Sequence, residues 1–107
     1  MPTRRRLPNR RPHEVFEFEL GVRYRAGVGY FENGGVAEIF LSANKFDSDL
    51  DVHARDSAIA ASLALQYGAS IEVIYKSMTK NANGAPSGPL GYILRELMRR
   101  NETGTNR

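Results

Sequence analysis

The sequence predicts a two-layer α+β domain, in which three helices pack on one face of a three-stranded antiparallel meander. Alternating apolar and polar residues from 14 to 30, followed by Asn33-Gly34, indicate two consecutive hairpins. From residue 48 onward apolar residues recur at helical spacing, and Ser48, Ser70 and Pro89 are suited to begin helices. A chain of 107 residues buries enough surface for one modest core, so a single domain is expected.

The first hairpin is predicted to join a strand at Glu14–Leu20 to a second strand that ends at Tyr30. A three-residue loop, Leu20-Gly21-Val22, aligns opposite charges and apolar faces across the two strands. A two-residue loop would mix the faces, because a slip of one residue inverts every side chain. The predicted pairs are Glu17 with Arg25, Phe18 with Tyr24 and Glu19 with Arg23.

The second hairpin is predicted to turn at Asn33-Gly34, since both residues tolerate the positive φ of a type I′ turn, and to lead into a strand at Val36–Leu41. The predicted pairs are Phe31 with Val36, Gly29 with Glu38, Val28 with Ile39 and Gly27 with Phe40. This register groups Phe31, Val36 and Phe40 as an apolar patch on the outer face of the sheet. Such a patch either lies under a loop or is a contact surface, which makes it a candidate partner interface.

The long helix is expected over residues 49–67, between a capping box of Ser48 and Asp51 and a stop at Gly68. It carries two apolar stripes. One stripe is Val52, Ile59 and Leu63, and the other is Ala54, Ala58, Ala61 and Leu65. A helix that is apolar on two sides is expected to lie between the sheet and another helix, with the alanines allowing that helix a close approach.

The N-terminal end differs in charge from the rest of the chain. Residues 1–12 contain no acid, whereas residues 13–99 hold eleven acidic residues against eight basic ones. The five arginines of this segment are Arg4, Arg5, Arg6, Arg10 and Arg11. We expect residues 1–12 to form a disordered arm, 13–100 the folded domain and 101–107 a frayed tail. The arm is suited to bind nucleic-acid phosphates, and the alternatives are a solubilising tail or an arm that docks on an acidic partner.

Residue types that carry enzyme chemistry are scarce. The sequence contains no cysteine, which excludes disulfides, thiolate nucleophiles and thiol radical relays, and it has no Gly-x-Ser-x-Gly motif. No catalytic residue is therefore assigned. Asp47, Asp49 and Asp51 have the spacing of a calcium loop, but Val52 and Ala58 stand where that loop requires Gly and a bidentate Glu. Neither a metal ion nor another cofactor is expected.

Two further expectations concern anions and membranes. Ser87 and Gly88 precede the last predicted helix, where free N–H groups are suited to hold an anion, although a plain loop and helix cap also explains them. No apolar run reaches the roughly 18 residues of a membrane span, and the Arg-rich start leads into proline rather than an apolar signal core. We expect a cytoplasmic protein without membrane contact.

Three segments carry a resemblance to a known family: Ala37–Leu41, Ser62–Gly68 and Pro86–Leu90. Together they resemble the TSCPD domain, a module found alone in small bacterial proteins and at the C-terminus of vitamin B12-dependent ribonucleotide reductases. The resemblance spans about residues 14–97. Of the five residues that name the family, Ser87 and Pro89 match, whereas Gly88 stands at the Cys position. The resemblance therefore implies an appended module outside the catalytic barrel, without a metal or thiol role.

These observations favour a non-catalytic accessory or regulatory module that binds a protein partner or itself. The resemblance links it to deoxynucleotide synthesis. The alternative is a nucleic-acid-associated protein that binds phosphates through the arginine arm. An enzyme in its own right is disfavoured, because no acid-base pair with a recognisable orienting group is present in the pattern.

Overall fold

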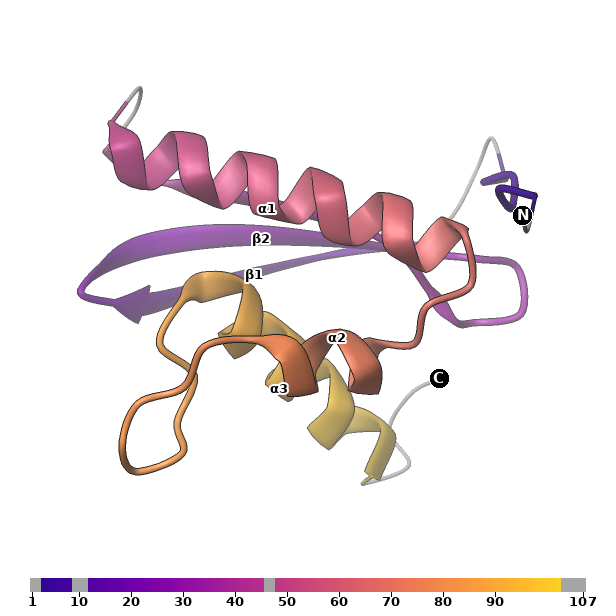
Figure 1. Ribbon diagram of the computed structural model, residues 1–107. Helices are drawn as coiled ribbons and strands as arrows, with labels where there is room; N and C mark the ends of the chain where they lie inside the picture. Colours follow the sequence, from indigo (N-terminus) through magenta and orange to yellow (C-terminus); the bar gives the residue numbers. More distant parts are fainter. Residues whose placement is uncertain (1–2, 9–11, 46–47, 103–107) are drawn as a thin grey trace.

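The structure, a computed structural model, describes residues 3–8, 12–45 and 48–102. The elements in chain order are β1 (His13–Leu20), β2 (Val22–Tyr30), β3 (Val36–Ala43), α1 (Asp49–Gln66), α2 (Ile71–Ser77) and α3 (Pro89–Glu102). The strands form one antiparallel sheet in the order β1-β2-β3, which confirms the predicted α+β class and meander. Helix α1 packs along β3. In Figure 1, α2 and α3 lie on the β1 side of the molecule.

The first hairpin has the predicted register. Glu17 pairs with Arg25, Phe18 with Tyr24 and Glu19 with Arg23. The chain reverses at Gly21, whose φ of 79° lies in the left-handed region that favours glycine. The alternation of apolar and charged residues therefore determined which face of β1 and β2 is buried.

The second hairpin departs from the prediction at its turn. Three predicted pairs are confirmed, Gly29 with Glu38, Val28 with Ile39 and Gly27 with Phe40. The predicted pair of Phe31 with Val36 is wrong, because a register shift between Gly29 and Tyr30 places Tyr30 opposite Val36.

The turn itself is also one position away from the expected one. The Gly34 N–H donates to the Phe31 carbonyl, so Glu32 and Asn33 are its central residues, and the fourth residue, Gly34, has a φ of 91°. The Asn33 side chain accepts from the Gly35 N–H at 3.0 Å and supports this longer loop.

One hydrophobic core lies between the inner face of the sheet and the helices. Its largest fully buried apolar side chains are Val28 and Ile39 from the sheet and Ile93 and Leu94 from α3. Burial of each such side chain stabilises the fold by roughly 1.5–3 kcal/mol. The aromatic ring of Phe18 stacks on Tyr92 of α3 at 4.3 Å between centroids, which attaches α3 to the β1 side of the sheet.

The orientation of α1 differs from the expected one. The buried stripe is Ala54, Ala58, Ala61 and Leu65, each at most 4% exposed, and α1 packs mainly on β3. The other stripe, Val52, Ile59 and Leu63, is 41–55% exposed. The expectation that the alanines face another helix is therefore wrong. Small side chains instead let the axis of α1 approach β3 closely enough for its polar side chains to reach the strand backbone.

The helix ends follow the predicted capping. The Ser48 side chain accepts from the Asp51 N–H at the start of α1, and the Ser70 side chain accepts from the Val73 N–H at the start of α2. No helix in the described part of the chain is long and apolar enough to cross a membrane.

Candidate functional site

The outer edge of β3 is closed by side chains of α1. The Ser62 hydroxyl accepts from the Ile39 N–H at 2.8 Å and lies 3.0 Å from the Ile39 carbonyl oxygen. The Gln66 amide donates to the Ala37 carbonyl at 3.0 Å, four residues further along the same helix face. An edge strand normally presents a row of unpaired backbone groups to a partner chain. At Ala37 and Ile39 side chains of α1 take up these groups, so a partner strand could not bond there without displacing the helix.

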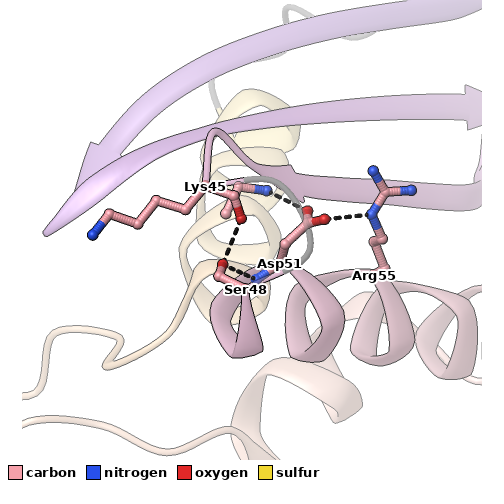
Figure 2. A network of polar contacts seen from close by, with 5 residues as sticks. Lys45, Ser48, Asp51 and Arg55 are labelled. Carbon is pink, nitrogen blue, oxygen red and sulfur yellow. Dashed lines mark hydrogen bonds and ion pairs between the residues drawn. The ribbon is translucent and has the colours of Figure 1, made fainter.

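The third side chain on this edge is Asp51, at the start of α1. Its carboxylate accepts from the Ala43 N–H and from Arg55 Nε, each at 2.9 Å. Figure 2 shows the Asp51 side chain directed toward Arg55, with Ser48 and Lys45 beside it. Ser48 accepts from the Asp51 N–H and donates to the Lys45 carbonyl. Asp51 is 1% exposed and these partners compensate its buried charge. Of the three acidic residues with calcium-like spacing, Asp51 attaches the helix to the strand, and Asp47 lies outside the described residues.

The first part of the arginine arm contacts the body. Arg4 Nε donates to the Gln66 side chain at 2.6 Å, and the Arg5 N–H donates to the Gln66 carbonyl at 2.7 Å. The Arg5 guanidinium lies over the ring of Phe31 at 3.6 Å from its centroid. The last turn of α1 contains no basic residue of its own, so Arg4 and Arg5 bring positive charge to the negative end of its dipole. These contacts were not predicted from the sequence.

A hollow of about 560 Å³ opens beside this contact. Its lining includes Arg5, Phe31, Glu14, Tyr30 and Arg100. Glu14 accepts two hydrogen bonds from the Arg100 guanidinium at 2.9 Å and one from the Tyr30 hydroxyl. The hydrogen bond with Glu14 raises the pKa of Arg100 above its ordinary value. The charges of Glu14 and Arg100 therefore compensate each other in this wall.

A second hollow, of about 520 Å³, lies between α1 and the other two helices. Its walls are largely apolar and include Ala60 and Ala64 of α1, Ile74 and Met78 near α2, and Leu90 of α3. The small alanine side chains keep α1 from filling this space. The hollow has the size of a small-molecule pocket but offers few polar groups that would orient a ligand.

The three predicted interface residues do not form one exposed patch. Phe31 is 4% exposed and lies under Arg5, whereas Val36 is half-buried and packs against the core. Phe40 is 51% exposed on the outer face of the sheet. The register shift near Tyr30 separates Phe31 and Val36 from Phe40. Of the three, Phe40 offers the most surface to a partner.

A different apolar row crosses the outer face of the sheet. Val15 faces Gly27 on β2, and Gly27 faces Phe40 on β3. Val15 is 59% exposed, and the His13 ring leans over Gly27 toward Phe40, with 6.1 Å between the two ring centroids. We call Val15, His13, Gly27 and Phe40 the outer row. The sequence contained the signal for it, because the predicted first-hairpin register already set Val15 opposite Gly27.

Ser87, in the candidate anion site at the start of α3, makes internal hydrogen bonds. The Ser87 N–H donates to the Thr79 carbonyl at 3.0 Å, and the Ser87 hydroxyl donates to Asn81 at 2.7 Å. The Gly88 carbonyl accepts the Tyr92 N–H within the first turn. These bonds agree with the loop-and-cap interpretation, and anion binding there stays a prediction.

The remaining candidate residues are the other arginines of the arm. Arg6 is exposed, whereas Arg10 and Arg11 lie outside the described residues. No described carboxylate forms an ion pair with Arg4, Arg5 or Arg6. Within the described residues there is also no group of three or more His, Asp or Glu side chains arranged to hold a metal ion.

The chain is homologous to a region of vitamin B12-dependent ribonucleotide reductases. The reductase of Streptantibioticus cattleyicolor is 34% identical over 92 residues, which cover 81% of this chain and 14% of the reductase. The reductases of Streptomyces clavuligerus and Streptomyces coelicolor are also 34% identical over 92 residues, which cover 9% of each. The chain thus spans a small part of the curated relatives that it matches. No protein-family model and no solved structure matches it.

Proposed function

We propose that this chain is a non-catalytic accessory module of the TSCPD type, which acts by binding other proteins in deoxynucleotide synthesis. The supporting observation is the 34% identity that extends over 81% of this chain but only 9–14% of the reductases. A similarity that covers nearly the whole folded body and so little of a large enzyme is typical of a shared appended domain.

The polar side chains of the body support an interaction role over a chemical one. Asp51, Ser62 and Gln66 bond the backbone of β3, and Glu14 bonds Arg100 and Tyr30. These hydrogen bonds hold elements of the fold together. The whole sequence contains no cysteine, so it lacks thiols for radical transfer. Surfaces such as the outer row remain for contact with other molecules.

The proposal is tested by mixing the purified chain with a full-length vitamin B12-dependent ribonucleotide reductase from the same source. We expect sedimentation velocity to show a complex, and we expect the rate of ribonucleotide reduction to change when the chain is present. Phe40→Ser tests the outer row as the contact surface. Ile59→Ser is the matched control, because Ile59 is 55% exposed and lies on α1 instead of the sheet. Absence of a complex together with an unchanged reduction rate would refute the proposal.

A second candidate function is phosphate binding by the arginine arm. It is favoured by one observation: Arg4 and Arg5 contact a neutral amide and an aromatic ring, so neither charge is neutralised by a described carboxylate. Both arginines therefore retain their attraction for nucleic-acid phosphates. The decisive measurement is the salt dependence of binding to duplex DNA with and without these arginines.

A further inference from the structure

The two edges of the sheet differ in how their backbone groups are used. On β3, the outward groups of Ala37, Ile39 and Ala43 bond to side chains of α1. Alternate residues of an antiparallel strand direct both backbone groups to the same side. The backbone of Phe40 therefore bonds that of its partner Gly27 on β2. Val28 and the other even-numbered residues of β2 direct their backbone groups to β1.

By the same alternation, four residues of β1 direct their N–H and carbonyl groups away from the sheet. These residues are His13, Val15, Glu17 and Glu19. No described residue makes a hydrogen bond with their backbone groups. An open edge of this length binds another strand readily unless it is blocked. The side chain of Val15, at 59% exposure, does not block it.

We propose that β1 pairs antiparallel with β1 of a second copy of this chain, around a two-fold axis at Val15, to form one six-stranded sheet. The partner is identified by the pattern of side chains along β1. In this register Val15 faces Val15 of the second copy, and His13 faces Glu17. The dimer thus contains two pairs of an imidazole with a carboxylate, one member of each pair from each copy, and an apolar contact lies on the axis.

Neighbouring registers are less favourable on the same grounds. An axis at Phe16 would set Val15 against the Glu17 carboxylate of the second copy. An axis at Glu17 would set two carboxylates directly opposite each other, which is destabilising. The axis at Val15 also aligns the outer rows of the two copies, since Val15, Gly27 and Phe40 lie across the strands in one line. The result is one continuous apolar line across six strands.

The proposal does not rest on the relationship to ribonucleotide reductase. A chain that dimerises without binding a reductase would overturn the proposed function alone, and a monomer that binds one would overturn the dimer alone. Measurements on the isolated chain therefore test the dimer separately.

The first experiment uses the absence of native cysteine. Paired residues on an antiparallel ladder have Cα atoms about 5.5 Å apart, which is within the range of a disulfide. Val15→Cys should therefore oxidise to a covalent dimer at protein concentrations where Glu17→Cys stays largely uncrosslinked. In the proposed register the two copies of residue 17 lie about 13 Å apart along the strands. A mixture of His13→Cys and Glu17→Cys chains should give the mixed dimer.

The second experiment measures association without a crosslink. Sedimentation equilibrium of the unmodified chain should show a monomer–dimer equilibrium, and Val15→Asp should weaken it at least about tenfold, because two carboxylates then meet on the axis. Ile59→Asp is the matched control, since its side chain is equally exposed but lies on α1, and it should leave the equilibrium unchanged. Circular dichroism establishes that both variants are folded. A monomer at all concentrations, equal crosslinking at residues 15 and 17, or dissociation caused by Ile59→Asp and not by Val15→Asp would overturn the proposal.

Discussion

The hydroxyl of Ser62 lies 2.8 Å from the amide nitrogen of Ile39 and accepts its hydrogen bond, which joins the middle of α1 to the outer edge of β3. Ile39 is among the largest fully buried side chains. The hydrogen bond from Ile39 to Ser62 is therefore buried, next to a side chain at the centre of the core.

Replacement of Ser62 by alanine should destabilise the protein by about 1–3 kcal/mol. The Ile39 N–H would then be buried without an acceptor, and its desolvation would no longer be offset. Urea denaturation measures the change in the free energy of unfolding. Ser57→Ala is the control, because the Ser57 hydroxyl bonds the Ala54 carbonyl within its own helix and should change stability by less than about 0.5 kcal/mol. Equal losses at both positions would contradict the edge-closing role of Ser62.

Enlargement of the alanine stripe should also destabilise the fold. Ala58 is 1% exposed and Ala61 is 4% exposed, both where α1 faces the sheet, so leucine at either position should overpack the contact and cost roughly 1–3 kcal/mol. Ala60 is exposed, and Ala60→Leu should have little effect on the thermal midpoint. A neutral result at both buried positions would show that the helix moves away from β3 at little cost.

The ion pair between Glu17 and Arg25 predicts a specific pH dependence. The hydrogen bond from Arg25, at 2.9 Å, lowers the pKa of the Glu17 carboxyl below its ordinary value of 4.5. A pKa that is lower in the folded state contributes stability above pH 4.5, and this contribution is lost as the pH falls through the folded pKa. Arg25→Gln should therefore move the pKa of Glu17 up toward 4.5, as measured by NMR titration of its carboxyl carbon. Arg23→Gln should give a smaller rise, because Arg23 acts on Glu17 through charge alone. A larger rise of the Glu17 pKa in Arg23→Gln than in Arg25→Gln would show that Glu17 pairs with Arg23 instead of Arg25.

The arginine arm predicts a bounded salt dependence. Five arginines can replace at most five counterions, so the logarithm of the affinity for duplex DNA should fall with the logarithm of the salt concentration at a slope no steeper than about −4.5. Replacement of all five by glutamine should abolish binding in gel shifts at low salt. A chain with Lys76 and Arg99 replaced by glutamine is the control for a general loss of charge. Equally weak binding by all three proteins would rule out the arm as a nucleic-acid site.

Single substitutions in the arm test its contact with the folded body. Arg4→Gln removes a charged hydrogen bond to Gln66 and should lower stability by about 1 kcal/mol, because the amide also holds the Ala37 carbonyl. Arg6→Gln should leave the thermal midpoint unchanged, since Arg6 is exposed. Equal midpoints for both variants would mean that the contact between the arm and α1 adds nothing to the fold.

The sequence determined those features that depend on short-range periodicity and on backbone chemistry. Charge and face alternation predicted the first-hairpin register, because a slip of one residue would set Phe18 against Arg23 or Arg25. Ser48, Ser70 and Pro89 gave the helix starts, since their side chains suit the first turn of a helix irrespective of what packs around it.

The tertiary structure decided which of two apolar stripes on α1 faces the sheet. Periodicity shows both stripes, but the outward backbone groups of β3 need polar partners, and Asp51, Ser62 and Gln66 lie on the alanine side. The tertiary structure also determined that Phe31 is buried, because the register shift at Tyr30 and the guanidinium of Arg5 together cover its ring. Contacts between residues 5 and 31, or 4 and 66, join segments that are distant in the chain. No local pattern encodes them, because they exist only after the sheet and α1 bring those segments together.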